Sequence, residues 1–376
     1  MLTGHGGNVS ELAAGVGCAP EAMLDMSSNV NPMGPPAGLV AYLRKELPRI
    51  VSLPEADNLG IRMRYARVWG LDVNTIVAAD GTTRFIYLLP QLLRSKNALI
   101  VEPTYADYAD ACMVHGVAVK PLTLGANEAF ALDAHRLFTA AEGCDTVFIC
   151  NPNNPTGQVL SRCVLETLIR ACPGTWFVVD ESYLPFLDTE NDDTLLCLDA
   201  PNLIVLRSIS KLYRIPGLRV GFIKAPVPIA SQLMQMIGPW SVNTLAQAAV
   251  RFIYGDLMKN RLFVTASRQT IAREKKRFYD AFCNNPCIEL FPSETLFVLA
   301  RLRKTVKKGT STRLTAACLK KTLLMKNRIL IRDCGNFSGL DRSFFRFSIQ
   351  DTKSNTRAIR AFAAALYAFA YPEKTP

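Results

Sequence analysis

Residues 203–219 read LIVLRSISKLYRIPGLR, and this stretch decides the fold class. Its first four residues are all apolar, which predicts a buried β-strand. Lys211 follows soon after that strand, where a mere surface charge would be poorly placed. Because the ligands of α/β proteins gather at the carboxyl ends of parallel strands, the stretch predicts an α/β fold with a functional lysine at the sheet edge. The alternative is a solvated lysine at a strand end.

Three further apolar runs read as buried strands, at residues 98–101, 146–150 and 176–179. Each is followed by a polar or Gly/Pro-rich segment: EPTYADY, NPNNPTG and DESY. Helical patterns at residues 161–172 and 243–254 fill the gaps between strands. This alternation predicts a large domain built on a mixed, mostly parallel sheet.

The last third of the chain has a different pattern. It predicts a long charged helix, three strands and a final helix, hence a smaller α+β domain, at residues 265–282, 295–301, 329–331, 344–349 and from Ser354 for about fifteen residues. The first forty residues, with Gly4, Gly6 and Gly7, read as an arm with little regular structure. We therefore expect an arm and part of the small domain in 1–44, the large domain in 45–264 and the small domain in 265–376.

Composition is that of a globular protein, with 49% apolar and 20% charged residues. The longest uncharged stretch, residues 225–250, contains Pro226, Pro228 and Pro239, which excludes a membrane span. The start of the chain has no basic region followed by an apolar core, so no secretory signal is expected. The 11 cysteines form no CxxC pair, which favours free thiols in a reducing cytoplasm and no metal site.

The net charge of +11 is unevenly distributed. Residues 266–376 hold 22 Lys/Arg against 8 Asp/Glu, whereas the rest of the chain is slightly acidic. Basic runs such as RLRKTVKKG (301–309) attract nucleic acid in some proteins, but no aromatic residues are interleaved and no DNA-reading motif is present. A solvated basic face, with no nucleic-acid partner, is the better interpretation. A basic domain also favours a doubly negative substrate.

Several residues around Lys211 suit a phosphate dianion. Two hydroxyls, Ser208 and Ser210, and the guanidinium of Arg219 are hydrogen-bond donors for such a group. A glycine turn that leads into a helical pattern, Gly81-Thr82-Thr83, offers free N–H groups at a helix start. These residues predict a phosphate-binding pocket that adjoins the lysine.

Other strand ends carry groups that suit a pyridine ring. Asp180 ends the strand WFVVD and can pair with a protonated ring nitrogen, which strengthens the ring as an electron sink. Tyr183 and Asn154 can both hydrogen-bond the phenolate oxygen of the ring, and Tyr105 can stack on the face of the ring. Together with Lys211, they predict a pyridoxal 5'-phosphate site in which Lys211 holds the cofactor as a Schiff base. Lys211, Asp180 and Tyr183 are the expected catalytic residues.

The segments GTT, PTY, NPNNPTG, DESY, SISK and IPGLRVG, in this order, resemble fold-type I, class I/II aminotransferases over nearly the whole chain. Within that superfamily the chain is most similar to the threonine-phosphate decarboxylases of cobalamin biosynthesis, which are close to histidinol-phosphate aminotransferases. The segments that carry this finer resemblance are HGGN (5–8), DMSSNVNP (25–32), SKLYRIPGLR (210–219), PWSVNTLAQ (239–247) and IRDCGNF (331–337).

The resemblance implies a substrate site for a small phosphorylated amino acid, and a homodimer. His5, Gly6 and Arg332 would bind the substrate phosphate. Asn29, Arg346 and Asn154 would hold the rest of the substrate, with Arg346 at the position of the family's carboxylate-binding arginine. Two separate cationic anchors suit a molecule that carries both a carboxylate and a phosphate.

The chain departs from the family pattern at two positions. Leu53 stands where relatives carry a tyrosine that reaches the cofactor phosphate across the dimer, so this bond is lost. Arg214 stands where relatives have a small residue, and either adds positive charge near the site or points outward. Either change could accompany a shifted substrate preference.

Three functions remain open at this point. The first is decarboxylation of O-phospho-L-threonine or O-phospho-L-serine to an amino-alcohol phosphate, and the second is an aminotransferase acting on histidinol phosphate or a similar phosphorylated amine. The enzyme would choose between them by which bond to the α-carbon it holds perpendicular to the cofactor ring. The third is a non-catalytic regulator, which would normally require an added helix-turn-helix domain for which the chain has no room.

Overall fold

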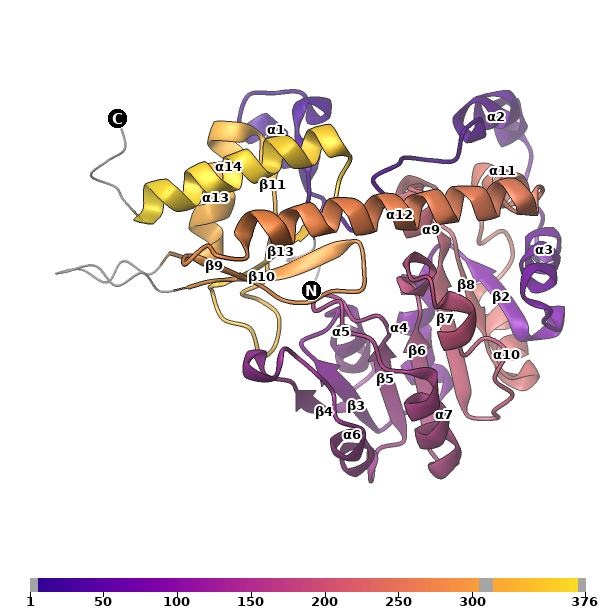
Figure 1. Cartoon of the computed structure of the whole chain (residues 1–376). Helices are drawn as coiled ribbons and strands as arrows, with labels where there is room; N and C mark the ends of the chain where they lie inside the picture. The colour runs from indigo at the N-terminus through magenta and orange to yellow at the C-terminus, as the bar shows by residue number, and fades with distance from the viewer. Residues whose placement is uncertain (1–5, 304–313, 371–376) are drawn as a thin grey trace.

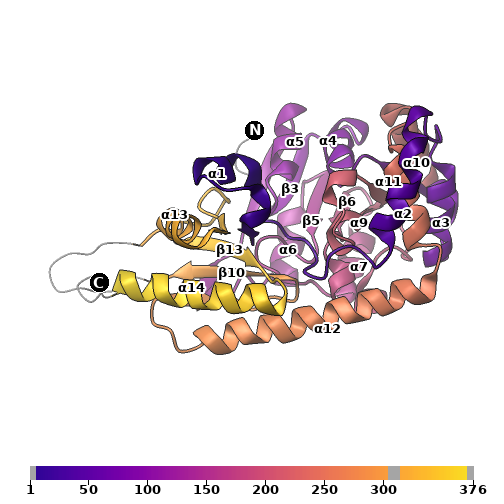
Figure 2. The same ribbon diagram turned by 90° about the horizontal axis from the view of Figure 1, so that it is seen from above.

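The computed structural model describes residues 6–303 and 314–370. Two sheets of different size form the two parts of the molecule (Figure 1). The helix α12 (Leu257–Phe282) runs along both parts, and the C-terminal helix α14 (Thr352–Ala370) lies beside it (Figure 2). This arrangement confirms the predicted α/β fold of the fold-type I class.

The larger sheet has seven strands in the order β2-β8-β7-β6-β5-β3-β4. All are parallel except β8, which pairs antiparallel with both of its neighbours. Helices cover both faces (Figure 1), which explains why the central strands are apolar throughout. The strands are β2 (Ile76–Ala79), β3 (Asn97–Glu102), β4 (Ala118–Thr123), β5 (Thr146–Cys150), β6 (Trp176–Asp180), β7 (Leu203–Ser208) and β8 (Gly221–Lys224).

The four strands predicted from apolar runs are β3, β5, β6 and β7, which are four of the five inner strands of this sheet. The other three strands were missed. β4 is an edge strand with a mostly exposed face and contains Pro121, so it lacks the apolar signal of a buried strand. β2 (IVAA) and β8 (GFIK) contain small or charged residues in place of a continuous run of large apolar ones, which weakens the strand signal.

Capping residues fix the ends of the two helices predicted in this part. The Ser161 side chain accepts a hydrogen bond at the start of α7, and the Asn243 side chain does the same for α11. The uncharged residues 225–250 fold into α10 and most of α11, and within the described ranges no helix is both long and apolar enough to cross a membrane. The helices are α3 (Leu59–Trp69), α4 (Thr82–Leu92), α5 (Asp107–Val114), α6 (Ala134–Ala141), α7 (Arg162–Ala171), α8 (Glu190–Asp193), α9 (Ile209–Leu212), α10 (Val227–Ile237) and α11 (Thr244–Ile253), with 3-10 turns η3 (Val73–Thr75), η4 (Ala126–Glu128), η5 (Leu184–Phe186) and η6 (Pro216–Leu218).

The smaller sheet is antiparallel, in the order β12-β13-β10-β9. Its core is rich in phenylalanine, with Phe278 of α12, Phe347 of β13 and Phe362 of α14 in mutual contact. The elements are β9 (Ile288–Leu290), β10 (Phe297–Leu302), α13 (Ala316–Asn327), β11 (Ile329–Leu330), β12 (Arg332–Asp333), β13 (Phe344–Ser348) and α14.

The long helix α12 begins earlier than the sequence pattern indicated. Asp256 caps it by accepting a hydrogen bond from the Lys259 amide, so the helix starts at Leu257 rather than near Thr265. The expected boundary between residues 264 and 265 therefore falls inside one continuous helix.

The N-terminal segment is more regular than predicted, and the prediction of an arm with little regular structure is wrong for the residues described. It contains α1 (Val9–Gly15), η1 (Pro20–Ala22), β1 (Leu24–Asp25), α2 (Leu39–Glu46) and η2 (Leu47–Val51). β1 pairs with β11, and Ala13 of α1 packs with Leu324 and Leu330. These contacts join residues some 300 positions apart, so no local sequence pattern predicts the pairing of β1 with β11 or the packing of α1.

Candidate active site

A cavity of about 590 Å³ lies at the carboxyl edge of the larger sheet and extends to the smaller one. Every residue predicted for the cofactor or the substrate lines it, except His5, which lies outside the described residues. The predicted residues brought together are Gly6, Asn29, Gly81, Thr82, Thr83, Tyr105, Asn154, Asp180, Tyr183, Ser208, Ser210, Lys211, Arg219, Arg332 and Arg346.

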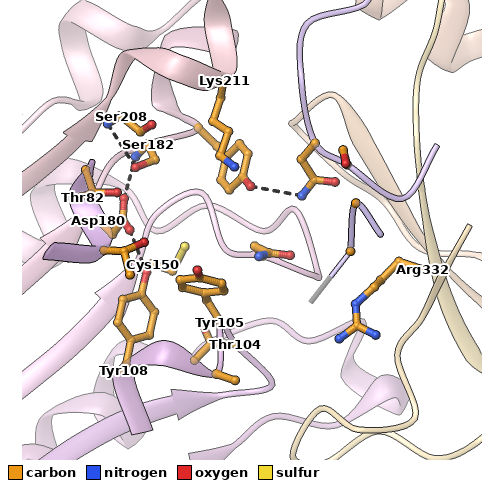
Figure 3. A pocket seen from close by; sticks show the side chains of 18 of the residues that line it. Thr82, Thr104, Tyr105, Tyr108, Cys150, Asp180, Ser182, Ser208, Lys211 and Arg332 are labelled. Carbon is orange, nitrogen blue, oxygen red and sulfur yellow. Dashed lines mark hydrogen bonds between the residues drawn. The ribbon is translucent and has the colours of Figure 1, made fainter. Parts of the chain in front are cut away.

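Lys211 lies in the one-turn helix α9, directly after β7, and its amine points into the cavity (Figure 3). Burial lowers the pKa of this amine to about 8, and the charges of Arg346 and Arg219 act in the same direction. Asp180 opposes this shift. A larger neutral fraction near neutral pH suits an amine that has to act as a nucleophile.

Asp180 ends β6 and is held by two residues that the sequence analysis did not single out. The Tyr108 hydroxyl donates to its Oδ2 at 2.9 Å, and the Ser182 amide donates to Oδ1 at 2.9 Å. Burial raises the pKa of the Asp180 carboxyl, while the hydrogen bonds from Ser182 and Tyr108 lower it. Tyr108 and Ser182 both lie in segments quoted above, EPTYADY and DESY, but nothing in those segments indicates that they contact Asp180.

The start of α4 forms an anion cradle with Arg219. The helix cap Gly81 has φ +115° and no capping side chain, which leaves amide N–H groups at the helix start free for a ligand. The φ of +115° favours glycine, and a Cβ at this position would come within 2.6 Å of the Arg219 guanidinium and displace it from the cradle. Ser208 ends β7 (Figure 3). The Ser210 hydroxyl donates to the Val220 carbonyl at 3.1 Å.

Tyr183 and Asn154 line the same cavity. The Asn29 amide donates to the Tyr183 hydroxyl at 3.2 Å, and burial raises the pKa of Tyr183 to about 12. The Oδ1 atom of Asn29 is buried without a hydrogen-bond partner in the described part of the chain. Asn154 accepts a hydrogen bond from Arg346 through its Oδ1, which leaves its amide N–H groups for a ligand.

Tyr105 lies below Lys211 in the pocket, near Thr104 and Tyr108 (Figure 3). Its ring meets that of Tyr108 edge to face, with centroids 5.7 Å apart. Its hydroxyl interacts with Thr83 and Asp107, and its pKa is raised, mainly by burial. These contacts hold the ring in one orientation, as a stacking partner requires.

Arg332 and Arg346 are direct cross-strand partners in β12 and β13. Two like charges at such positions destabilise a sheet unless an anion lies between or beside them. Arg346 is buried, donates to the Ser27 carbonyl at 2.7 Å and has an Nε atom without a described partner. Arg332 lies across the cavity from Asp180 and Ser208 (Figure 3), where its guanidinium donates to Asn336 at 2.9 Å.

The segment 27–32 connects the two ends of the cavity. Asn31 donates through its backbone to the Lys211 carbonyl at 3.0 Å and through its side chain to the Leu212 carbonyl at 2.8 Å. Arg214 donates to the carbonyls of Asn31 and Pro32, at 3.1 and 3.2 Å. Arg214 therefore does not point outward, and the segment is fastened to the turn that carries Lys211.

The backbone also packs closely where the N-terminal segment reaches the cavity. A Cβ at Gly6 would come within 2.8 Å of the Ser27 carbonyl oxygen, and the Gly7 amide donates to the Ser27 hydroxyl at 3.0 Å. Leu53, in contrast, is not among the residues that line the cavity and is 73% exposed.

The donor set fits pyridoxal phosphate. The glycine-capped start of α4 with Arg219 suits its phosphate, the buried Asp180 carboxylate suits its ring nitrogen, and the Lys211 amine suits its aldehyde carbon. A lysine, a carboxylate and an anion cradle at the edge of one mixed sheet define the class of fold-type I pyridoxal-phosphate enzymes.

The chain belongs to the family "aminotransferase class I and II", whose model matches residues 22–362. It is 30% identical to threonine-phosphate decarboxylase of Salmonella typhimurium, over 96% of both chains. It is 28% identical to the adenosylcobalamin biosynthesis bifunctional protein CobDQ of Leptospira interrogans, over 97% of this chain but only 41% of that protein.

Solved structures agree with these relatives. L-threonine-O-3-phosphate decarboxylase of Porphyromonas gingivalis superposes with a TM-score of 0.79 at 31% identity, over 92% of this chain and 100% of that one. Histidinol-phosphate aminotransferases are among the further relatives, at 23% to 28% identity. Family, fold class, enzymatic nature and the pyridoxal-phosphate cofactor are thereby confirmed as predicted.

Proposed function

We propose that this protein decarboxylates a small phosphorylated amino acid, O-phospho-L-threonine or O-phospho-L-serine, and releases carbon dioxide and an amino-alcohol phosphate for the cobamide nucleotide loop. The observation that carries the proposal is the cross-strand pair Arg332 and Arg346 at the end of the cavity away from Asp180. A substrate with a carboxylate and a phosphate offers each arginine an anion. The similarity to two proteins named threonine-phosphate decarboxylase supports the same substrate class.

The cofactor would be held by the residues that suit its parts. Gly81, Thr82, Thr83, Ser208 and Arg219 would bind its phosphate, with Ser210 supporting the adjacent backbone through Val220. Asp180 would pair with its ring nitrogen, Tyr105 would stack on its ring, and Tyr183 and Asn154 would bond its phenolate oxygen. When bound, pyridoxal phosphate supplies an electron sink for the electrons of a broken bond at the substrate α-carbon.

The chain's own residues determine which bond breaks. Arg346 and Asn29 would hold the substrate carboxylate, while Arg332, Gly6 and His5 would hold its phosphate. Fixing both ends turns the α-carbon to a single orientation, so the bond perpendicular to the ring is set by the distance between the two anchors. Once carbon dioxide has left, Lys211 in its protonated form would deliver a proton to the α-carbon.

Product analysis tests the proposed reaction. The purified holoenzyme is incubated with O-phospho-L-threonine or O-phospho-L-serine, with and without 2-oxoglutarate, and carbon dioxide and oxo-acid are measured. We expect carbon dioxide without any requirement for 2-oxoglutarate, and none from Lys211→Ala. The absence of carbon dioxide with both substrates would overturn the proposal.

Transamination of histidinol phosphate or a similar phosphorylated amine is the second candidate. It is supported by the histidinol-phosphate aminotransferases among the relatives. In that case turnover would depend on 2-oxoglutarate, and no carbon dioxide would form. The same experiment therefore distinguishes the two reactions.

We also propose a cytoplasmic homodimer. Its support is a cluster of exposed apolar side chains in η2 and the loop after it, namely Ile50, Val51 and Leu53, which are 58%, 88% and 73% exposed. Such a patch is typical of a protein interface.

We retain the three-part division at residues 44 and 264 as a proposal, with α12 as the connection between the two larger parts.

A further inference from the structure

A second cavity, of about 530 Å³, lies behind the turn that carries Lys211. We call it the rear cavity. Its walls come from α3, α9 and the first half of α12, and it shares Ser208 with the active-site cavity. Ile209 and Leu212, on either side of Lys211 in sequence, line the rear cavity while Lys211 lines the active site. The single turn of α9 is therefore the partition between the two cavities.

Tyr65 of α3 brings an unused polar group to the rear cavity. Its ring is 1% exposed and stacks on Phe222, with centroids 4.2 Å apart, yet its hydroxyl has no hydrogen-bond partner among the described residues. The charges that act on this hydroxyl include those of Arg207 and Glu190, which also line the cavity. A buried hydroxyl without a partner is unfavourable, and a ligand that accepts its hydrogen bond would remove that cost.

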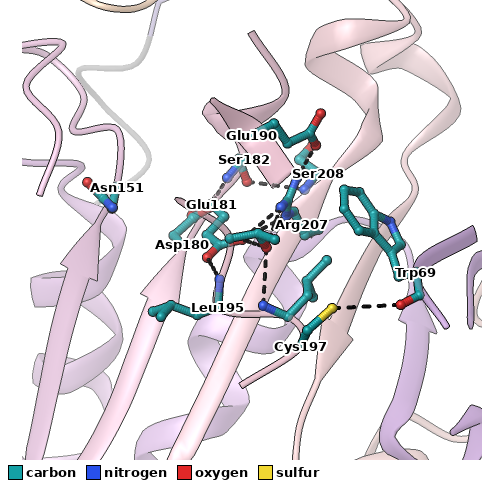
Figure 4. Close-up of polar contacts among 12 residues, drawn as sticks. Trp69, Asn151, Asp180, Glu181, Ser182, Glu190, Leu195, Cys197, Arg207 and Ser208 are labelled. Carbon is teal, nitrogen blue, oxygen red and sulfur yellow. Dashed lines mark hydrogen bonds and ion pairs between the residues drawn. The ribbon is translucent and has the colours of Figure 1, made fainter. Parts of the chain in front are cut away.

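The carboxylate oxygens of Glu181 and Glu190, beside Arg207, already accept hydrogen bonds. Arg207 lies between Glu181 and Glu190, beside Trp69 (Figure 4), and donates to both carboxylates at 2.9 and 2.7 Å. The second oxygen of Glu190 accepts from Arg268 at 2.6 Å. Both oxygens of Glu190 are therefore occupied.

Two arginines that line the rear cavity, in contrast, have hydrogen-bond donors that no described residue engages. Arg261 forms no ion pair with a described residue and lies exposed on α12, where it lines the cavity. Arg268 uses its Nε and Nη2 atoms, and no hydrogen bond to a described residue engages its Nη1. The Tyr65 hydroxyl and the guanidinium groups of Arg261 and Arg268 are therefore hydrogen-bond donors available to a ligand in the rear cavity, and the two arginines add positive charge.

Three aromatic side chains contribute to the walls of the rear cavity, beside aliphatic and polar residues. Trp69, Tyr213 and Tyr254 line the same cavity, and its volume lies in the range of about 300–1,000 Å³ of small-molecule sites. It is also far larger than the roughly 30 Å³ that a single water would occupy. Aromatic walls with a cluster of donors select a flat ring that carries a negative group.

We propose that the rear cavity binds a small aromatic monoanion, with its negative group at Tyr65, Arg261 and Arg268 and its ring between the aromatic walls. The single turn of α9 is the wall that this site shares with the active-site cavity. The proposal is independent of which reaction the active site catalyses.

Isothermal titration of the holoenzyme with naphthalenesulfonate tests the site, with naphthalenemethanol as the neutral control. We expect one saturable site for the sulfonate, and a quenching of Trp69 fluorescence as it fills. Tyr65→Phe and Arg261→Gln should each weaken binding about threefold to tenfold. Arg273→Gln, on the same helix but outside the cavity, removes the same charge and should leave the affinity unchanged.

Several outcomes would overturn the proposal. They are the absence of saturable binding, equal affinity for the neutral alcohol, and equal affinity of the Tyr65→Phe, Arg261→Gln and parent proteins. Displacement of the sulfonate by excess O-phospho-L-threonine in direct competition would assign it to the active site and would overturn the rear site as well. Because Arg261 is exposed, its replacement leaves the fold intact and keeps the test decisive.

Discussion

The chemistry of the site depends on how single residues set the charge of their neighbours. Lys211 is the main case, because burial and the nearby arginines Arg346 and Arg219 lower the pKa of its amine to about 8. The neutral amine is the form that reacts with an aldehyde. Arg346 thus has a proposed role as an anchor for a substrate carboxylate, and its charge increases the neutral fraction of Lys211.

Arg346→Gln should move the pH dependence of cofactor binding. The fraction of neutral Lys211 rises with pH through the pKa of its amine, so the rate at which the apo-protein takes up pyridoxal phosphate should rise with a midpoint near pH 8. Removing a nearby positive charge favours the ammonium form, so the midpoint should increase by roughly one pH unit. Stopped-flow absorbance over a pH series measures it. Arg332→Gln is the control, and an unchanged midpoint in Arg346→Gln would contradict the assignment.

Tyr108→Phe should weaken cofactor binding. The Tyr108 hydroxyl donates to Asp180 Oδ2 at 2.9 Å in a fully buried setting, and it lowers the pKa of that carboxyl. Loss of a hydrogen bond to a charged group costs about 1.5–3 kcal/mol, so the dissociation constant of pyridoxal phosphate should rise about tenfold or more. Equilibrium dialysis measures it, with Tyr87→Phe, outside the cavity, as the control. Equal affinities of the two variants would show that the bond does not serve the cofactor.

At the scale of elements, the site is assembled by segments that end or begin at one sheet edge. β6 and β7 bring Asp180 and Ser208 there because both are parallel strands, and β8 begins there because it is antiparallel. The segment 27–32 is then fastened across them by hydrogen bonds from Asn31 and Arg214. Arg214 therefore links the segment 27–32 to the turn that carries Lys211.

Arg214→Gly should loosen that contact. Arg214 has φ +47°, so glycine adopts the same backbone without strain and only the two hydrogen bonds to Asn31 and Pro32 are lost. We expect the substrate KM to rise about threefold to tenfold with a smaller change in kcat, since the chemistry at Lys211 is untouched. Steady-state kinetics measure both constants. Arg94→Gly, an exposed arginine with φ +53°, is the matched control, and equal effects of the two changes would refute the role of Arg214.

At the scale of the whole molecule, the exposed apolar cluster around η2 is the clearest sign of a partner surface. Val51 is 88% exposed, and Ile50 and Leu53 flank it. Monomeric proteins rarely leave such a group in water. The Leu53 side chain cannot form the hydrogen bond of a tyrosine, and it is suited to apolar contact in the proposed dimer.

Val51→Asp should dissociate the proposed dimer. A charge buried at an interface without a partner costs about 3 kcal/mol or more, which corresponds to a dimer dissociation constant at least about a hundredfold higher. Light scattering during size-exclusion chromatography over a range of concentrations measures it. Met325→Asp replaces another exposed apolar residue, 59% exposed on α13, and should leave the mass unchanged. A dimer that survives Val51→Asp would exclude this face.

The sequence by itself determined four parallel inner strands of the large sheet and the residues that follow them. Apolar runs such as residues 146–150 and 203–206 are local signals, and parallel strands necessarily deliver their next residues to one edge. Lys211, Asp180 and Asn154 could therefore be assigned to one pocket without a structure. The helical patterns at residues 161–172 and 243–254 were equally readable, because they depend on neighbours in sequence, and they correspond to α7 and α11.

Only the tertiary structure decided which side chains touch across long separations. Tyr108 reaches Asp180 over 72 positions, and Arg346 reaches Ser27 over 319. The register that sets Arg332 opposite Arg346 is likewise fixed by strand pairing and not by either segment alone. Such contacts arise from packing, and their energies depend on burial, so no local pattern carries them. The rear cavity at Tyr65 belongs to the same category, since its walls come from helices and a strand far apart in the chain.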